Sequence, residues 1–338
     1  MPQQRKAVYF EKPGPPSTLI YGDLPIPDLA PGEVLVKTEA VSLNPIDTYL
    51  RAGADFWDLP KPFIVGSDIA GTVEKIGGEV TTLKVGDRVW GTNQGLCGRQ
   101  GVFADRVAVA EDWLYLIPDG VDFEEVAALA LVGVTAHLGL FQEGDLKEGE
   151  TLFLQGGSGG VGSTVLQMAK IAGATVFTTA SSDEKAALCY ELGADKVVNY
   201  KTDDVLTEAK KFSPAGFDLF WETGREPNFD QIVDLLARRG RLILMAGRDA
   251  RPEFPVGPFY VKGCSIHSFV MFDTTPKQLR DCSVDINRWL ASGQLKANIA
   301  QRFPLSQAAE AHTLQEANTL ELSGTLHGKI VLYPDGNR

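Results

Sequence analysis

The first third of the chain consists of short apolar runs separated by glycine and proline. Residues 33–42 alternate apolar and polar side chains with a period of two, which predicts a strand with one buried face. Shorter runs predict further strands at 6–10, 19–24, 102–109 and 113–117, and residues 46–50 begin a short helix that Gly53 ends. Closely spaced glycines between 66 and 86 are typical of a small barrel. The pattern therefore predicts a β-rich domain over residues 1–125.

From residue 122 onward the pattern changes, because segments with helical periodicity alternate with short apolar runs. Helical spacing appears at 123–131 and 134–141, and the alternation with strands follows. Strands are expected at 151–155, 176–179, 196–199, 217–221, 241–245 and 265–270, and helices at 183–191, 205–211 and 229–237. Strands that alternate with helices of roughly ten residues predict a doubly wound parallel sheet, which we assign to residues 126–271.

The C-terminal segment does not continue this alternation. Residues 275–291 and part of 302–318 have helical spacing, and 328–332 is an apolar strand. We expect this segment, residues 272–338, to complete the β-rich domain. The predicted fold class is thus α/β, with a doubly wound parallel sheet inserted into a β-rich, barrel-like domain.

A glycine-rich turn follows the first strand of the predicted parallel sheet. The sequence LFLQGGSGGVGSTVLQMAKIAG places Gly157, Gly159 and Gly162 in a G-x-G-x-x-G spacing between a strand and a helix. Without side chains, this turn lets a pyrophosphate approach the first amides of the helix, where the helix dipole favours an anion. The turn predicts a dinucleotide site that also includes Ser158, Gly160 and Val161. The alternative is an ordinary strand–helix turn with packing glycines.

Composition narrows the class of protein. The chain has 338 residues, 44% hydrophobic and 22% charged, which suits a globular protein of two domains. The formal net charge of −12 argues against nucleic acid or an anionic membrane as a partner. Four scattered cysteines without metal-ligand spacing indicate buried or half-buried free thiols in a reducing compartment, so we expect a cytoplasmic protein. We find no signal peptide and no apolar run of membrane-spanning length.

Several motifs resemble one family. The stretches VSLNPIDTYLRAG, GSDIAGTVEKIG, VGDRVWG, QGGSGGVG, LGADKVVNY and HGKIVL are similar to the medium-chain dehydrogenase/reductase superfamily, and within it to the zinc-free quinone oxidoreductase branch that includes zeta-crystallin. The similarity runs from about residue 6 to 332. It implies a GroES-like catalytic domain with an inserted Rossmann nucleotide-binding domain.

The resemblance also predicts that no metal is bound. Zinc-dependent relatives carry a catalytic cysteine where this chain has Asn44, and Gly-His-Glu where it has Gly66, Ser67 and Asp68. A serine hydroxyl is a poor zinc ligand beside imidazole and thiolate. The cysteine-rich structural zinc lobe of such relatives is also missing.

The end of the second strand of the parallel sheet distinguishes between the two nicotinamide cofactors. NAD-binding sheets place an acidic residue there to bind the adenosine ribose, but this chain has Ala180, followed by Ser181 and Ser182. Ser181 can donate a hydrogen bond to a 2′-phosphate and Lys185 supplies a cation. Tyr200 matches the family tyrosine that packs beside this phosphate. NADPH is therefore the expected cofactor. The alternative is that Ser181–Asp183 form only a helix N-cap and first turn with Lys185 in solvent, and the two interpretations are compatible.

The remaining site residues are implied by the family. Near the nicotinamide the resemblance places Thr135, Met245, Gly247, Phe269, Val270 and Lys329. Asn44 is expected to bind a substrate carbonyl or the cofactor ribose, and Tyr49 to donate a hydrogen bond or proton in the substrate pocket. Asp47 and Arg51, one helical turn apart, are expected to form a structural salt bridge beside the site, with a catalytic role for the pair as the alternative.

The function predicted from these residues is hydride transfer from NADPH to a quinone, an acceptor that needs positioning more than polarisation. A 2-alkenal or enone double-bond reductase is the alternative enzyme. An NADPH-binding, crystallin-like structural protein with little turnover is the alternative of another class. By analogy with relatives that pair through the last strand of the parallel sheet, we expect a homodimer, with a tetramer as a second possibility.

Overall fold

The computed structural model describes residues 3–321 and 323–336, which fold into two compact units. The first unit contains Met1–Val134 and Phe272–Arg338, and the second contains Thr135–Met271. Helix α2 (Phe123–His137) runs through the junction at Val134 without a break and continues as a π-helical segment, Leu138–Glu143. The alternating pattern that begins near residue 122 thus starts on a helix that both units share.

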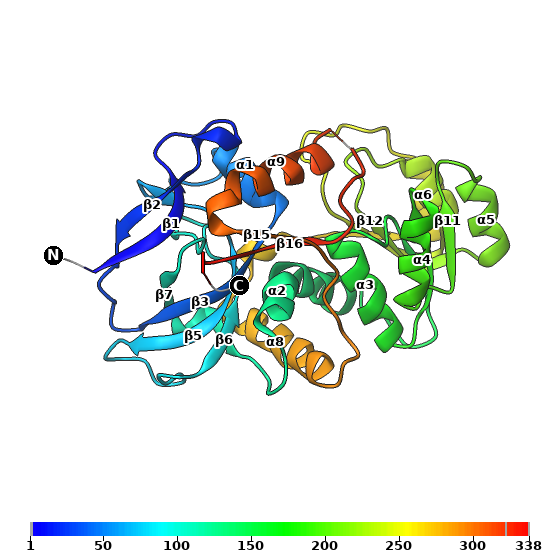
Figure 1. The fold of residues 1–338 in the computed structure, drawn as a ribbon. Coiled ribbons are helices and arrows are strands. Elements are labelled where there is room, and N and C mark those ends of the chain that lie inside the picture. The colour runs from blue at the N-terminus through cyan, green and yellow to red at the C-terminus, as the bar shows by residue number, and fades with distance from the viewer. Residues whose placement is uncertain (1–2, 322, 337–338) are drawn as a thin grey trace. The chain divides into compact units, whose positions relative to one another are not determined.

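The second unit is built on a six-stranded parallel sheet, as the alternating pattern predicts (Figure 1). Its strand order is β11-β10-β9-β12-β13-β14, and every neighbouring pair is parallel. The strands are β9 (Thr151–Leu154), β10 (Thr175–Ala180), β11 (Lys196–Asn199), β12 (Phe217–Glu222), β13 (Leu236–Leu244) and β14 (Ser265–Ser268). The connecting helices are α3 (Gly160–Ile171), α4 (Asp183–Glu191), α5 (Val205–Phe212), α6 (Phe229–Leu235) and α7 (Val256–Lys262), of which the sequence pattern missed α7.

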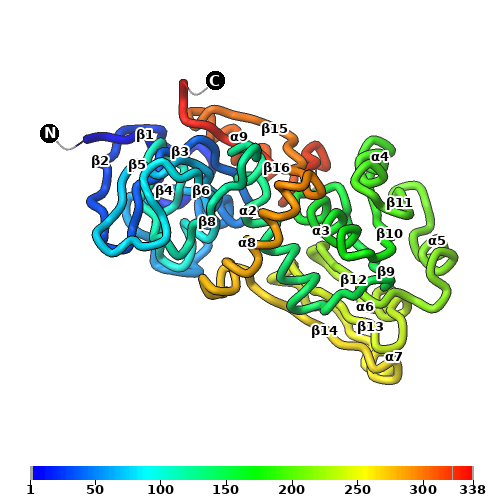
Figure 2. Tube along the Cα trace, turned by 90° about the horizontal axis from the view of Figure 1, so that it is seen from below, coloured from blue at the N-terminus to red at the C-terminus, as the bar shows by residue number. Residues whose placement is uncertain are grey.

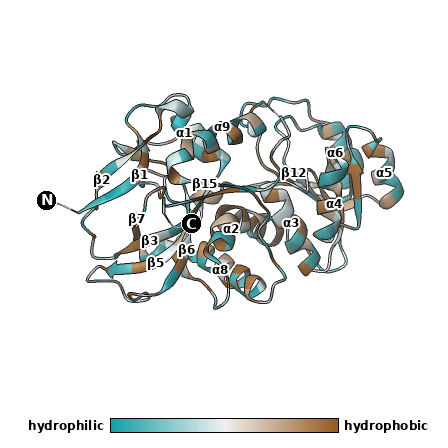
Figure 3. Ribbon diagram, in the orientation of Figure 1, coloured by the Kyte–Doolittle hydropathy of each residue, from teal (hydrophilic) through white to brown (hydrophobic). Residues whose placement is uncertain are grey.

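Aromatic side chains fill the core of this unit. Phe153 on β9 stacks on Phe220 of β12 with ring centroids 4.3 Å apart, and on Phe177 of β10 at 5.0 Å. All three side chains are buried. Because helices cover a doubly wound sheet on both faces, its strands bury their middle residues, and the central part of β11, with the buried Val197 and Val198, is brown in Figure 3.

The first unit holds a three-stranded and a seven-stranded sheet. The three-stranded sheet has the order β2-β1-β4, and the larger sheet β15-β16-β3-β5-β6-β8, with β7 paired to β3. The N-terminal strands are β1 (Gln4–Phe10), β2 (Ile20–Pro25), β3 (Glu33–Leu43), β4 (Phe63–Ile64), β5 (Asp68–Ile76), β6 (Arg88–Gly91), β7 (Arg106–Ala110) and β8 (Leu114–Leu116). The C-terminal elements are α8 (Pro276–Ala291), β15 (Ile299–Pro304), α9 (Ala308–Thr319) and β16 (Lys329–Tyr333), and α1 (Pro45–Ala52) follows β3.

Strand β16 joins the two ends of the chain, since it pairs antiparallel with β3 and parallel with β15. The sequence pattern missed β15. It also began β7 too early, because residues 101–104 bond instead to β1, to β4 and to the residue after β4. Val8 N–H donates to Phe103 O at 2.8 Å, Gly101 N–H to Ile64 O at 3.0 Å and Phe103 N–H to Val65 O at 2.9 Å.

The expected Asp47–Arg51 salt bridge is wrong. The fully buried Arg51 guanidinium donates to Gly14 O at 2.7 Å and pairs with Glu316 on α9, so it ties α1 to α9. Asp47 instead accepts bonds from Asn44 and Ser67. The spacing of one turn allowed the local pair, but packing of α9 on α1 supplied Arg51 with a carboxylate distant in sequence.

One helical stretch in the described residues, 123–143, is long and apolar enough to cross a membrane, but 78% of its most apolar window is buried inside the protein. It is a core helix of the fold. The four cysteines are free, as expected, but Cys97 is exposed rather than buried.

Candidate functional site

The dinucleotide-site residues predicted in the second unit cluster at strand ends. The glycine turn follows β9, Ser181 follows β10, and Tyr200 follows β11. Met245 and Gly247 follow β13, and Phe269 and Val270 follow β14. Because all six strands are parallel, their carboxyl ends lie along one edge of the sheet, where doubly wound proteins bind ligands.

The glycine turn carries two different kinds of glycine. A Cβ on Gly162 would lie 2.1 Å from Gly156 O, and one on Gly157 would lie 2.4 Å from Thr178 Oγ1, so both are needed for packing. A Cβ on Gly159 would meet only Gly156 O at 3.7 Å, an ordinary contact. The fold therefore gives no reason for glycine at 159, whereas a pyrophosphate that must approach the backbone does.

Helix α3 begins directly after this turn and leaves its first amides open to a ligand. Gly159 is its N-cap, with no capping side chain, and the first turn contains no acidic residue. Within the helix, Gly160 O accepts a hydrogen bond from Thr164 Oγ1, and Gly159 O accepts one from the Ser163 N–H. An anion at this end would meet the helix dipole and uncapped N–H groups.

The end of β10 has no acidic side chain at the position where NAD-binding sheets place one. Ala180 is the last residue of the strand and is buried. Ser182 forms the N-cap of α4 by accepting a bond from Lys185 N at 3.3 Å, so the N-cap interpretation is confirmed for Ser182. This cap uses the backbone N–H of Lys185 and not its ammonium. Tyr200 N donates to Ala180 O at 3.0 Å, which fixes the end of β11 beside the end of β10.

The end of β12 carries a buried carboxyl group, Glu222, that the sequence pattern did not single out. Glu222 is its last residue, is buried, and accepts bonds from the backbone N–H groups of Thr223 and Gly224. Burial raises the pKa of this carboxyl. It borders a small cavity of about 90 Å³ together with Gln155 at the end of β9. Polar residues directly after the apolar run 217–221 were the signal that could have revealed it.

The residues expected near the nicotinamide lie at the ends of β13 and β14 and on the helix after the unit boundary. Ala246, between Met245 and Gly247, has a φ of 76°, and Gly247 has 71°. Left-handed backbone at a non-glycine residue is strained and is concentrated at functional sites. Met245 Sδ accepts a bond from Trp221 Nε1 at 3.2 Å, and the Phe269 ring packs edge-on against Trp221. Thr135 is buried.

The predicted site residues of the first unit form a buried polar cluster. Asn44 caps α1, its backbone N–H donates to Asp47 Oδ2 at 2.8 Å, and its side-chain Nδ2 donates to Asp68 Oδ2 at 2.7 Å and to Ser67 Oγ at 3.4 Å. Ser67 Oγ donates to Asp47 Oδ1 at 3.0 Å. Asp68 also accepts bonds from two neighbouring hydroxyls, those of Ser42 and Thr92.

Lys329 supplies the positive charge of this cluster. Its ammonium donates to Leu43 O at 2.9 Å and to Asn44 Oδ1, and lies 3.7 Å from Asp68 Oδ2. Burial lowers its pKa, against the attraction of Asp68 and Asp47. The Asn44 side chain therefore links the Lys329 ammonium to the Asp68 carboxylate. Its bond to Ser67 is the longest that it makes, so that amide hydrogen is the one that could turn to a substrate at least cost. Tyr49 is half-buried on α1 and is not one of the residues joined by the hydrogen bonds of this cluster.

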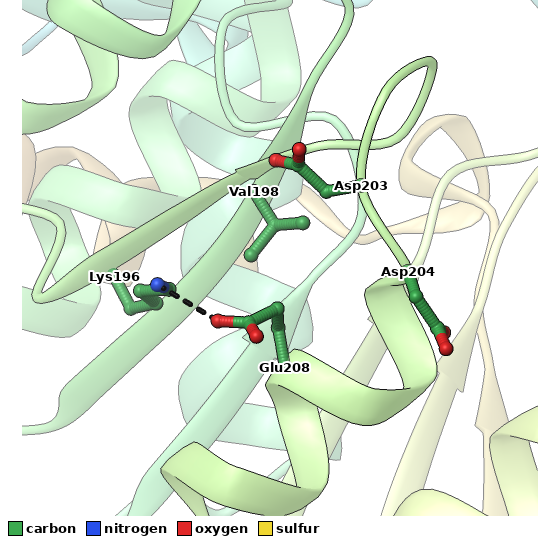
Figure 4. A pocket seen from close by; sticks show the side chains of 5 residues that line it. All are labelled: Lys196, Val198, Asp203, Asp204 and Glu208. Carbon is green, nitrogen blue, oxygen red and sulfur yellow. Dashed lines mark ion pairs between the residues drawn. The ribbon is translucent and has the colours of Figure 1, made fainter.

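Two further observations bear on ligands. A hollow of about 360 Å³ lies on the second unit against β11 and α5, and none of its lining residues belongs to the glycine turn (Figure 4). Its lining side chains already serve the fold: Lys196 pairs with Glu208 at 3.1 Å and Asp204 caps α5. Within residues 3–321 and 323–336, no three His, Cys, Asp or Glu side chains are placed to hold a metal ion.

Comparison with known proteins identifies the family. A zinc-binding dehydrogenase model matches residues 160–285, and an alcohol dehydrogenase GroES-like domain model matches residues 30–119. A quinone oxidoreductase of Pseudomonas aeruginosa is 35% identical over 329 residues, covering 91% of this chain and 95% of the relative. This chain belongs to the quinone oxidoreductase branch of the medium-chain dehydrogenase/reductase superfamily.

Solved structures of superfamily members agree with this assignment. Mycobacterial Rv1454c complexed with NADPH is similar with a TM-score of 0.84, 29% identity, and coverage of 98% of this chain and 100% of that one. An NAD-dependent alcohol dehydrogenase has a TM-score of 0.87, 29% identity, and coverage of 97% and 99%. The predicted fold class, a Rossmann sheet with a GroES-like domain, is confirmed, and the relatives support an oxidoreductase with a nicotinamide cofactor and a small-molecule substrate.

The buried Asp47 carboxyl predicts a pH-dependent stability. Burial and the charge of Asp68 raise its pKa to about 7, from 3.8 in the absence of the fold. Between these values the unfolded chain binds fewer protons than the folded one, so the Asp47 contribution to the free energy of unfolding falls by about 2–4 kcal/mol as pH rises from 4 to 7, then levels off. Urea unfolding of wild type and Asp47→Asn across this range measures it.

The Asp204→Asn variant provides a control of opposite sign. Bonds from Thr207 lower the pKa of Asp204, so its contribution is present above its unfolded pKa and is lost as pH falls. A stability difference between wild type and Asp47→Asn that stays constant, or grows in favour of wild type with rising pH, would contradict the burial of an ionisable Asp47.

The two kinds of glycine predict different defects. Gly162→Ala should destabilise the fold by about 1–3 kcal/mol, because its Cβ meets Gly156 O. Gly159→Ala should leave the urea midpoint unchanged but weaken NADPH binding at least roughly tenfold, because the methyl group occupies the space of the pyrophosphate. Calorimetric titration and urea unfolding of both variants test this. Wild-type affinity in Gly159→Ala would show that the pyrophosphate lies elsewhere.

Proposed function

We propose that the protein is an NADPH-dependent, metal-free quinone oxidoreductase of the cytoplasm. The observation that carries the proposal is the carboxyl edge of the parallel sheet, where an open glycine turn stands beside a strand end that lacks a carboxylate. A 2′-phosphate at Ala180 would meet no strand-end acid, and Ser181, Lys185 and Tyr200 offer it a hydroxyl, a cation and a phenol. The four free thiols support the reducing compartment.

The carboxyl edge of the parallel sheet also supplies the contacts that we propose for the rest of the cofactor. The turn from Gly157 to Gly162, with Ser158, Gly160 and Val161, would hold the pyrophosphate at the start of α3. Residues at the ends of the later strands, together with α2, would border the nicotinamide: Met245, Gly247, Phe269, Val270 and Thr135. We propose Lys329 as a further cofactor contact. Its ammonium is positioned by its hydrogen bonds to Leu43 O and Asn44 Oδ1.

The chemistry of the first-unit cluster supports catalysis without zinc. Asn44 and Ser67 offer an amide and a hydroxyl, which are weak zinc ligands, and both are already bonded to the carboxylates of Asp47 and Asp68. The Lys329 ammonium stands 3.7 Å from Asp68 Oδ2, where it would repel a divalent ion. These side chains thus bond to one another and to the Lys329 ammonium, so the positive charge of the cluster is that of a lysine.

The protein's remaining task in such a reaction is modest. A reduced nicotinamide, when bound, supplies the hydride. A quinone already accepts electrons strongly, so the chain needs only to orient its carbonyl and provide a proton. We assign Tyr49 as the donor to the substrate oxygen, with Asn44 as a second donor through the amide hydrogen that makes the long bond to Ser67.

A substrate panel with both cofactors tests the proposed function. Purified protein should oxidise NADPH in the presence of quinones, with a kcat/KM at least roughly tenfold higher than with NADH, and a chelator should not change the rate. Tyr49→Phe should lower kcat without unfolding the protein.

The other outcomes identify the alternatives. Turnover of 2-alkenals or enones without quinones would assign a double-bond reductase. Tight NADPH binding without turnover across both panels would assign a crystallin-like structural role. Stoichiometric zinc that is required for activity would overturn the metal-free proposal.

We further propose a homodimer that pairs through β14. Among the described residues this strand is at the end of the sheet and pairs only with β13, and Ile266 and Val270 are 39% and 43% exposed. Light scattering should give about twice the chain mass of 36.6 kDa, and Ile266→Lys should shift it toward the monomer with NADPH binding retained. A monomeric wild type would refute the dimer, and a fourfold mass would indicate the tetramer.

A further inference from the structure

The end of β11 turns sharply and places Lys201 at the tip of the turn. Asn199 organises this turn: its carbonyl accepts from Thr202 N at 3.1 Å and Asp203 N at 2.9 Å, and its Oδ1 accepts from Lys201 N at 3.1 Å. Asn199 also pairs with Ala180 across the parallel strands. The turn thus holds the Lys201 backbone close to the strand end that lacks a carboxylate.

A second lysine, Lys185, stands on the helix that follows that strand end. Lys185 stands in the first turn of α4, which packs against β10 and β11, as Figure 2 shows for the elements. Burial and then the charge of Lys201 lower the pKa of Lys185, which places the two ammonium groups within electrostatic range of each other. Two like charges near one strand end cost free energy unless an anion lies between or beside them.

The acidic groups nearby do not neutralise Lys201. Asp203 accepts bonds from Asn199 N at 3.0 Å and from Thr202 Oγ1 at 3.0 Å, so its carboxylate faces its own turn. Glu184 attracts Lys185. Among the ion pairs of the described residues, none includes Lys201, although the chain carries a net charge of −12 and the nearby Lys196, Lys210 and Lys211 each pair with a carboxylate.

We propose that Lys201 is a second cation for the 2′-phosphate of the cofactor and sets the preference for NADPH over NADH. It acts with Lys185, and the two ammonium groups match the double negative charge of a phosphate monoester. The inference rests on the proposed function, because it concerns the same phosphate, but it assigns a residue that neither the motif nor the family resemblance singled out. The competing interpretation is a solvated surface lysine that contributes only to bulk charge.

Binding of two nucleotide fragments isolates the phosphate from the rest of the cofactor. Calorimetric titrations with 2′,5′-ADP and with 5′-ADP compare the full-length protein with Lys201→Met, Lys201→Arg and the control Lys211→Met. Lys211 is an exposed lysine of the same unit that pairs with Glu208, so its loss removes the same bulk charge at another place.

Lys201→Met should weaken 2′,5′-ADP binding about fivefold to tenfold and change 5′-ADP binding less than about twofold. Lys201→Arg should stay within about threefold of wild type, since it keeps the charge. The loss in Lys201→Met should shrink when sodium chloride rises from about 0.05 M to about 0.5 M.

Three results are decisive. Equal effects of Lys201→Met and Lys211→Met on 2′,5′-ADP would overturn the inference and leave the proposed function intact, provided that Lys185→Met still lowers selectivity. A wild type that binds 2′,5′-ADP and 5′-ADP equally would instead refute the NADPH preference itself. Selective loss in Lys201→Met, with retention in Lys201→Arg, would establish the second cation.

Discussion

The nucleotide-binding unit depends on one close backbone approach at the start of α3. Gly162 passes so near to Gly156 that a single methyl group would lie 2.1 Å from its carbonyl oxygen. This contact lets the helix begin immediately after β9 and directs its first amides toward the carboxyl edge of the sheet. The parallel order of the strands then brings every other strand end to the same edge, so the position of the site follows from the packing of two glycines.

The first unit has a different constraint, because it buries charge. Asp47 and Asp68 are both fully enclosed with one ammonium, that of Lys329, and the three groups are connected through Asn44 and Ser67. Such a cluster is tolerated only when almost every polar atom is bonded. Strand β16 carries Lys329 and pairs with β3, whose end precedes Asn44, so the return of the C-terminal segment is necessary for the charge balance of the cluster.

Substitutions at the metal positions of zinc-dependent relatives therefore have a structural meaning. Asn44 and Ser67 stand where such relatives have metal ligands. The buried carboxylates of Asp47 and Asp68 therefore need another positive charge, and the Lys329 ammonium provides it. The residues on which the metal-free proposal rests thus also bond to one another inside the domain. This explains why an amide, a hydroxyl and an ammonium are found together in the interior, where each by itself would be costly.

The sequence by itself determined the parallel sheet, the glycine turn and the missing carboxylate at Ala180, because each depends on residues that are neighbours in the chain. Periodicity identified α4 and β11 to the residue, but it missed α7 and β15, neither of which has a fully buried residue to mark a face in the sequence. Only the tertiary structure decided the partners of Arg51 and Lys329, since Glu316 and Leu43 lie 265 and 286 positions away from them in the chain. It also decided that Gly159, unlike Gly162, is not needed for packing. Side-chain partners and the space around a Cβ depend on segments that meet only in the folded chain, and local patterns do not contain that information.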